Sequence, residues 1–288
     1  MSARNLLNLL LALAVVGLAL LVAFEPGQAP PPAKISLTSL TAKEIQHIEI
    51  RHGASTPVVL EKQDGQWRLQ GLGAVRVSAS KLDTLLSLAR ASSHARYAAA
   101  SVDRGQTGLD RPELQVSLND TPLIFGATEP INGRRYVQVG DSVHLIDDRY
   151  SYLLRGDAAS FVDSALLPAD AALSAIRLPD FSLREEDGHW LLQAGAASPG
   201  ADALQRFADD WRHARALRVS AATEKTAGAK TIEIQLRQQP QPLRFALSQA
   251  DDETILTRED LGLSYHFTAS TAESLLTLPA PPASEKTD

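Results

Sequence analysis

The tetrapeptide Ser78–Lys81 fits the pattern S-x-x-K, which can place a serine nucleophile beside a lysine base at the start of a helix. In penicillin-binding enzymes this pattern acts with S-x-N and K-T-G elements, and residues 117–119 (SLN) and 225–227 (KTA) are loose counterparts. The serine and asparagine of the second element flank a leucine on a predicted strand, and alanine replaces the glycine of the third. A capped surface helix is therefore the favoured interpretation of Ser78 and Lys81, and a hydrolase that uses them is the alternative.

The histidines and acidic pairs do not form a recognisable metal or catalytic pattern. A zinc site on a helix uses histidines four residues apart, and no two of the seven histidines have that spacing. His144 and His266 each lie between apolar strand residues, so alternation predicts both as exposed histidines on a polar face. Adjacent acids point to opposite sides of a strand and predict solvated turns. We assign no catalytic, cofactor-binding or metal-binding residue.

Composition excludes several classes of function. The 288 residues carry a formal charge of −6 and no polybasic block, so nucleic-acid binding is not expected. The chain has no cysteine, which excludes thiol catalysis, disulfides and cysteine-ligated zinc.

The N-terminus predicts a membrane anchor. Residues 6–24 are an uncharged, largely apolar stretch of about the length that a helix needs to cross a bilayer. Arg4 precedes it, so the N-terminus is expected in the cytoplasm and the bulk of the chain outside. We predict an anchor over residues 1–24 and a stiff proline-rich linker over 25–35. A cleaved signal peptide is the alternative, but Pro30 would follow the cut.

The body of the chain contains an internal repeat. The heptad DGQWRLQ at residues 64–70 returns as DGHWLLQ at 187–193, and further landmarks recur in the same order at offsets of similar size. These further landmarks are His94-Ala95-Arg96 with His213-Ala214-Arg215, Pro122-Leu123 with Pro242-Leu243, and His144 with His266. We predict two repeats, over 36–160 and 161–278, followed by a disordered tail over 279–288.

Each repeat alternates strand-like runs with one amphipathic helix. Asp-Gly before each tryptophan predicts a two-residue hairpin turn. Apolar residues at helical spacing follow, namely Leu82, Leu85, Leu86 and Ala89 in one repeat and Leu204, Phe207, Ala208 and Trp211 in the other. We predict an α+β fold in which each repeat is a curved antiparallel sheet with one main helix packed on it. Trp67 and Trp190 are expected in the core beneath that helix rather than as sugar-stacking platforms.

A family resemblance rests on the first repeat. Trp67 after the Asp-Gly turn, the helix, the Gly108–Pro112 element and the strands VSL, PLIFG and YVQV resemble the bacterial domain of unknown function 4340. The resemblance is best over 45–154, and the Gly-Leu-x-x-Pro element is missing from the second repeat. It implies one N-terminal anchor, a chain otherwise outside the cytoplasm, and an accessory role beside ABC-transporter-type complexes.

These observations together predict a single-pass bacterial inner-membrane protein with a periplasmic, non-catalytic binding or scaffolding region. A protein partner in the envelope is expected at the sheet edges or in a groove between the repeats. The alternative is a periplasmic cell-wall or glycan hydrolase that uses Ser78 and Lys81.

Overall fold

The structure is a computed structural model of the chain, and it describes residues 10–17, 35–72, 75–194, 199–222, 229–250 and 252–278. Two compact units divide the chain, Met1–Ile35 and Ser36–Asp288. In the smaller unit residues 10–17 are helical, and no helix among the described residues is long and apolar enough to span a membrane. Most of the predicted anchor and linker and the whole predicted tail lie outside the described residues.

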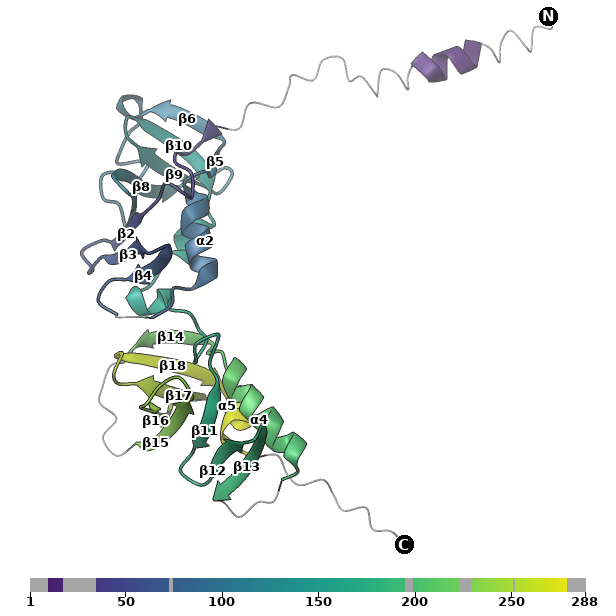
Figure 1. The fold of residues 1–288 in the computed structure, drawn as a ribbon. Coiled ribbons are helices and arrows are strands. Elements are labelled where there is room, and N and C mark those ends of the chain that lie inside the picture. Colours follow the sequence, from purple (N-terminus) through teal and green to yellow (C-terminus); the bar gives the residue numbers. More distant parts are fainter. Residues whose placement is uncertain are drawn as a thin grey trace, which may run out of the picture. The chain divides into compact units, whose positions relative to one another are not determined.

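The larger unit contains two eight-stranded antiparallel sheets (Figure 1). The first has the order β4-β3-β2-β7-β8-β9-β10-β6. Its strands are β2 (His47–His52), β3 (Val58–Gln63), β4 (Gln66–Leu69), β6 (Ala95–Ala98), β7 (Leu114–Leu118), β8 (Thr121–Thr128), β9 (Arg134–Val139) and β10 (Ser142–Asp147). Two short strands, β1 (Ile35–Ser36) and β5 (Ser92–Ser93), form a separate pair.

The second sheet has the order β13-β12-β11-β15-β16-β17-β18-β14. Its strands are β11 (Leu173–Arg177), β12 (Ser182–Glu186), β13 (His189–Ala194), β14 (Arg218–Ala221), β15 (Lys230–Leu236), β16 (Leu243–Ala250), β17 (Glu253–Arg258) and β18 (Leu263–Thr268). When the strands of each sheet are numbered along the chain, the two orders are identical. This confirms the predicted α+β class and agrees with a tandem duplication.

Helices occupy corresponding places in the two repeats. The helices are α2 (Ala79–Leu88), α3 (Tyr150–Leu153), α4 (Ala201–His213) and α5 (Ala269–Leu276), with 3-10 turns η1 (Ala99–Ser101) and η2 (Ala158–Phe161). Both α2 and α4 follow the third strand of a sheet, and both α3 and α5 follow its last strand. The capping-box spacing of Ser80 and Asp83 predicts Ser80 as the N-cap of α2, but the N-cap is Ser78, whose side chain forms no capping hydrogen bond, and Ser80 lies in the first turn.

The two predicted hairpin turns are confirmed. Asp64 and Gly65 both have positive φ angles (49° and 78°), and Gln63 pairs directly with Gln66 across the turn. Asp187 and Gly188 repeat this geometry with φ angles of 51° and 84°. Two consecutive residues with positive φ define a type I′ turn, whose twist matches that of the flanking strands.

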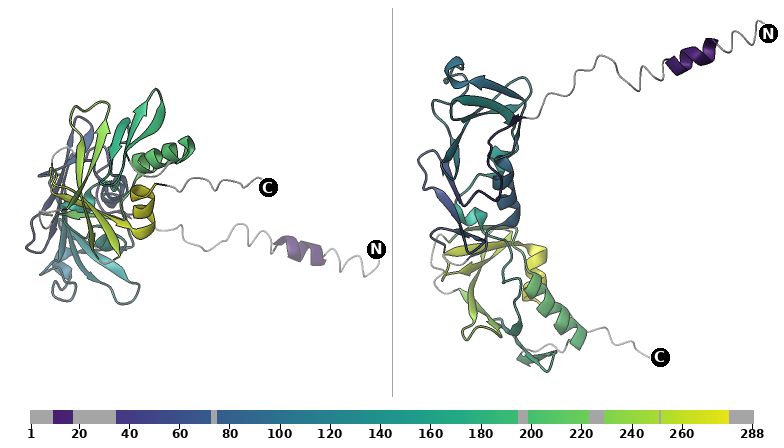
Figure 2. Two further views of the ribbon diagram at one scale, coloured as in Figure 1. Left: turned by 90° about the horizontal axis from the view of Figure 1, so that it is seen from below. Right: turned by 45° about the horizontal axis from the view of Figure 1, so that its top comes forward.

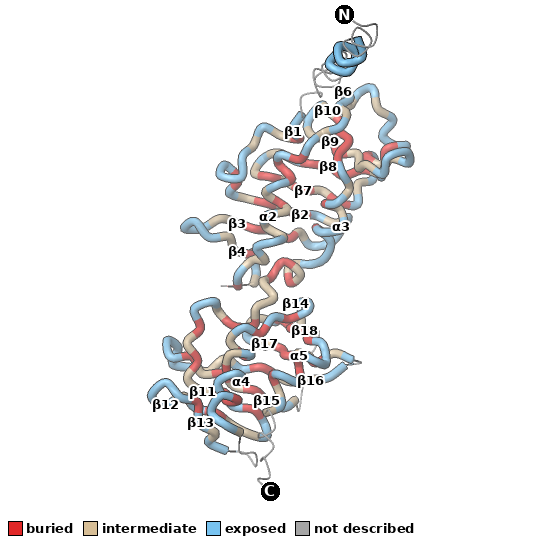
Figure 3. Tube along the Cα trace, turned by 90° about the vertical axis from the view of Figure 1, so that its right-hand side faces the viewer, coloured by how far each residue is buried: buried red, intermediate tan, exposed pale blue. Residues whose placement is uncertain are grey.

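In each repeat buried residues lie along the strands of the sheet and on the main helix (Figure 3). In the second repeat the predicted stripe of α4 is buried, and α4 packs against β11, β13 and α5 (Figure 2). Trp190 and Trp211 are buried there, as predicted. Trp67 is only half-buried, although it packs against the core of its repeat, and α2 is shorter than α4.

Gly126 is required by a close approach between β8 and the loop that follows η1. A Cβ atom at Gly126 would lie 2.2 Å from the carbonyl oxygen of Thr107, and the neighbouring Ala127 N–H donates to that same oxygen at 2.7 Å. Gly108 in the loop has a φ of +68°, and its own Cβ would lie 2.9 Å from the Ala127 nitrogen. The family-like loop is therefore seated directly on a bulge of β8, where the register with β9 shifts.

We expect Gly126→Ala to lower the free energy of unfolding by about 1–3 kcal/mol, the usual cost of overpacking a tight contact. Gly105→Ala is the matched control, because its Cβ would meet only the side chain of Asp103, at 3.3 Å. Chemical denaturation of both variants measures the difference. Equal stabilities would show that the loop does not rest on Gly126.

Candidate functional site

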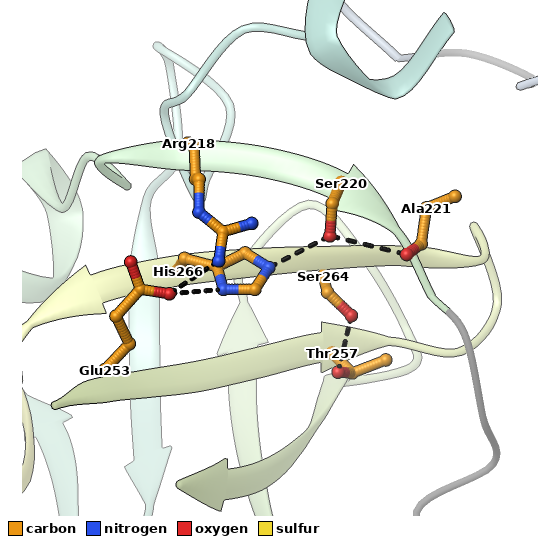
Figure 4. Close-up of polar contacts among 7 residues, drawn as sticks. All are labelled: Arg218, Ser220, Ala221, Glu253, Thr257, Ser264 and His266. Atoms are coloured by element: carbon orange, nitrogen blue, oxygen red, sulfur yellow. Dashed lines mark hydrogen bonds and ion pairs between the residues drawn. The ribbon is translucent and has the colours of Figure 1, made fainter. Parts of the chain in front are cut away.

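A polar cluster on the second sheet joins a serine, a histidine and a glutamate (Figure 4). Ser220 lies on β14, His266 on the adjacent β18 and Glu253 on β17, so three neighbouring strands each supply one member. Arg218 stands directly opposite His266 in the register, and Ser220 stands opposite Ser264. Antiparallel pairing therefore fixes all of these side chains on one face.

His266 links a serine to a carboxylate. Its Nε2 lies 2.9 Å from Ser220 Oγ, and its Nδ1 lies 2.9 Å from Glu253 Oε2. A carboxylate can only accept, so Nδ1 carries a proton. In the neutral ring Nε2 is then an acceptor for the Ser220 hydroxyl, whose other acceptor is the Ala221 carbonyl oxygen at 3.3 Å. This is the order of contacts through which a histidine takes a proton from a serine nucleophile.

Arg218 holds the acidic member of the cluster in its charged form. Its guanidinium donates to Glu253 Oε2 at 2.6 Å, and this bond, followed by the bond from His266, holds the pKa of Glu253 below its ordinary value. Beside the relay, Thr257 and Ser264 share a hydrogen bond of 3.0 Å. The polar atoms of the cluster therefore satisfy one another within the sheet.

The prediction that His144 and His266 are exposed is wrong. Their relative exposures are 4% and 6%. His266 does face away from the core residues Leu263 and Tyr265, but the side chains of the polar cluster enclose it.

His144 also lies on a different face of its sheet from the one predicted. Strand β10 is buried on both sides, and His144 shares its side with Ile146 and stands opposite the core residue Val137. Its Nδ1 lies 3.0 Å from Ser93 Oγ, and burial, followed by the charge of Arg96, lowers its pKa. The two histidines therefore do not occupy equivalent positions, and their match in the sequence is a chance one.

The structure does not bring Ser78 and Lys81 together. Ser78 Oγ lies 3.2 Å from Ser80 Oγ, whereas Lys81 Nζ donates to Ser160 Oγ at 3.1 Å and lies 4.4 Å from the centre of the Phe161 ring. Burial lowers the pKa of Lys81, and the charge of Asp157 opposes that shift. Lys81 thus joins α2 to η2, and no side chain caps the start of α2, contrary to the predicted capped surface helix.

The other two elements of the S-x-x-K hypothesis give it no support. Asn119 closes the turn between β7 and β8, where its Oδ1 accepts from the backbone of Gln46 and His47. Residues 225–227 lie outside the described part of the chain. No group of three or more potential metal ligands occurs among the described residues.

A groove of about 1040 Å³ lies beside the second sheet. One wall is the connector 162–168 together with Val75 and Arg76, and the other wall comes from β15, β16, and the turn between β17 and β18. Three arginines and three acids line it, namely Arg76, Arg244, Arg258, Asp163, Glu259 and Asp260. Arg258 binds Asp260 through two hydrogen bonds, so part of this charge is already paired.

The comparisons with known proteins identify a family without an activity. The family described as "Domain of unknown function (DUF4340)" matches residues 67–277, well over half of the chain. The chain therefore belongs to the DUF4340 family, as the resemblance of the first repeat predicts. No curated protein and no solved structure matches the chain.

The lowered pKa of Glu253 predicts how the cluster responds to acid. A carboxyl group whose pKa falls on folding stabilises the folded state above its unfolded pKa, about 4.3 for glutamate, and this contribution is lost as the pH falls through the lower folded value. We expect Glu253→Gln to be less stable than wild type at pH 7 and to approach it at pH 3. Thermal unfolding across this range measures the effect.

Glu259→Gln is the control for this experiment, because Glu259 is exposed and forms no ion pair with any described residue. If Glu253→Gln and Glu259→Gln follow the same acid profile, the contacts of Glu253 do not stabilise the folded chain.

Proposed function

We propose that this chain is a single-pass protein of the bacterial inner membrane whose periplasmic part binds a protein partner without catalysis. The support for the anchor is the apolar stretch 6–24 and the arginine before it. In this proposal each repeat is a curved sheet covered by one main helix, and the pair of repeats is an accessory or scaffolding part of an envelope complex. The resemblance to anchored relatives supports the same arrangement.

The observation that carries the binding role is the groove of about 1040 Å³. Its volume is at the upper end of the range for ligand sites, and such sites combine an apolar floor with a few polar groups. Leu243 and Phe245 contribute apolar surface, while Gln239 and Gln241 offer amide donors and acceptors. An extended polypeptide segment presents the same mixture of apolar side chains and backbone amides.

The charge of the groove also favours such a partner. Its three arginines are balanced by three acids, and the Arg258–Asp260 and Arg76–Asp163 pairs neutralise part of each set. A site for a polyanion would carry an excess of positive charge. A neutral or mixed-charge peptide segment meets no electrostatic penalty here.

We expect a photo-crosslinking amino acid at Gln241 to trap one partner protein in intact cells that express the full-length chain, with the product in the membrane fraction. Gln193 is the matched control, since both glutamines are exposed and only Gln241 lines the groove. Thr231→Trp should abolish the product, because it fills the groove from an exposed position. The same products from Gln241 and Gln193, or none from Gln241, would contradict the proposal.

A periplasmic hydrolase is the second candidate, and the Ser220–His266–Glu253 geometry now favours it more than Ser78 and Lys81 do. Acyl transfer also requires hydrogen-bond donors aimed at the developing oxyanion. Ser220 and His266 do not line the groove, which leaves the relay without the substrate site that the groove provides.

Labelling with a fluorophosphonate probe separates the two functions. We expect no label on the wild-type chain, because the Ser220 side chain forms hydrogen bonds within the sheet and does not act on a substrate. A label that disappears in Ser220→Ala but persists in Ser264→Ala would establish the hydrolase instead, since Ser264 bonds to Thr257 and does not contact the histidine. A label that disappears only in Ser78→Ala would restore the Ser78 and Lys81 alternative.

A further inference from the structure

A second cavity, of about 250 Å³, lies in the first repeat beneath the loop that carries the family element. Gly108 and Arg111 of that loop line it, together with His52 at the end of β2, Arg135 of β9 and Arg155 after α3. No residue of the groove contributes to it. The cavity is therefore a separate feature of the first repeat.

Two unsatisfied polar atoms belong to residues that line this cavity. Among the buried side-chain nitrogen and oxygen atoms of the described chain, only His52 Nε2 and Arg135 Nε have no hydrogen-bond partner. A buried polar atom without a partner costs about 1–3 kcal/mol, so each such atom requires an explanation. Both atoms are closed off from solvent, so they lie behind the surface of the cavity and show that polar side chains are gathered in its wall.

The cavity is also rich in positive charge. It is lined by three arginines and one histidine, against a single acid, Glu113. Arg135 is held by Asp148 at 2.6 Å and by the Gly126 carbonyl oxygen at 2.6 Å. Arg111 and Arg155 are exposed, and neither forms an ion pair with a residue that the structure describes. The guanidinium groups of Arg111 and Arg155 are thus free to bind a ligand at the mouth of the cavity.

The loop that forms one wall is held in place before any ligand arrives. Arg104 donates to the Leu109 carbonyl oxygen and to Gln138 Oε1, each at 2.6 Å, and Thr107 accepts from Ala127 N. A wall fixed in this way spares a ligand the entropy cost of ordering it.

We propose that this cavity binds an oxyanion, the carboxylate or phosphate group of a small molecule, between the guanidinium groups of Arg111 and Arg155 and the imidazole of His52. Arginine presents its N–H donors in a planar fork that matches two oxygens of such a group. The site shares no residue with the groove of the second sheet. It gives a function to the loop with the Gly108–Pro112 element, which only the first repeat has.

The state of His52 gives the site a pH dependence. Burial, followed by the charge of Arg155, lowers the pKa of His52, and the carbonyl of Leu154 opposes this shift. Arg111, Arg135 and Glu113 are the other charged groups around the cavity. A bound anion favours the protonated ring and raises its pKa, so affinity for the anion increases as the pH falls through the titration of His52.

The test measures binding of inorganic phosphate and of acetate to the purified full-length chain in detergent, by calorimetric titration at constant ionic strength. We expect at least one of the two anions to bind, tighter at pH 6 than at pH 8, and to bind at least tenfold more weakly to Arg111→Gln/Arg155→Gln. His52→Gln should remove the pH dependence. Binding of phosphate alone or acetate alone supports the site and identifies which group it prefers.

Arg206→Gln is the control, because it removes one exposed arginine of α4 outside the cavity and should leave binding unchanged. Thermal unfolding of each variant without ligand checks that the fold is retained. The proposal is overturned if neither anion binds wild type, if chloride competes equally with both, or if the folded double variant binds as wild type does.

Discussion

Trp211 is fully buried, and its indole N–H donates to the Leu275 carbonyl oxygen at 2.9 Å. This one side chain ties α4 to α5 and contacts Phe245 of the sheet, with ring centres 6.4 Å apart. An open antiparallel sheet has one apolar face, which must be covered before the sheet is stable in water. In the second repeat Trp211 holds α4 and α5 over the apolar face of the sheet. The opposite face carries mostly polar residues.

That division explains where the polar cluster lies. The core side chains of β18 are Leu263, Tyr265 and Phe267, so the intervening positions 264 and 266 must face away from α4. On this second face His266 pairs directly with Arg218 of β14 and Ile255 of β17, and Ser220 and Glu253 bond to its ring from diagonal positions. In the first repeat β10 is buried on both sides, and its histidine takes a core position instead. The same fold thus places chemically similar residues in different environments.

Local sequence patterns predict the features that depend on local physics. The Asp-Gly turns, the buried stripes of the helices and the repeated order of elements depend on backbone preferences and on apolar spacing within a few residues. The exposure of His144 could not be predicted this way, because alternation reports which residues share a side but not whether the other side is also covered. On that other side Leu145 stands opposite Tyr136 and Val143 opposite Tyr97, contacts set by pairing with β9 and β6.

The candidate sites also depend on long-range contacts, which local sequence patterns do not predict. Lys81 meets Ser160 rather than Ser78, and the polar cluster joins residues 218, 253 and 266, which no short motif connects. The Gly108–Pro112 element does stand out in the sequence. Its structural role, however, depends on the close packing of the loop against Gly126. The carbonyl oxygen of Thr107 leaves no room for a side chain there, and this close contact is visible only in three dimensions.

The two repeats differ in the cavities that they carry. The connection between β14 and β15 covers residues 222–229, too short to hold a counterpart of the loop between β6 and β7, which covers 99–113. In the first repeat that loop covers the end of the sheet and encloses a small cavity with excess positive charge. In the second repeat a wide groove of balanced charge runs along β15 and β16, from Ala229 to the turn that holds Gln241. The two repeats thus carry sites of different size and charge on the same strand order.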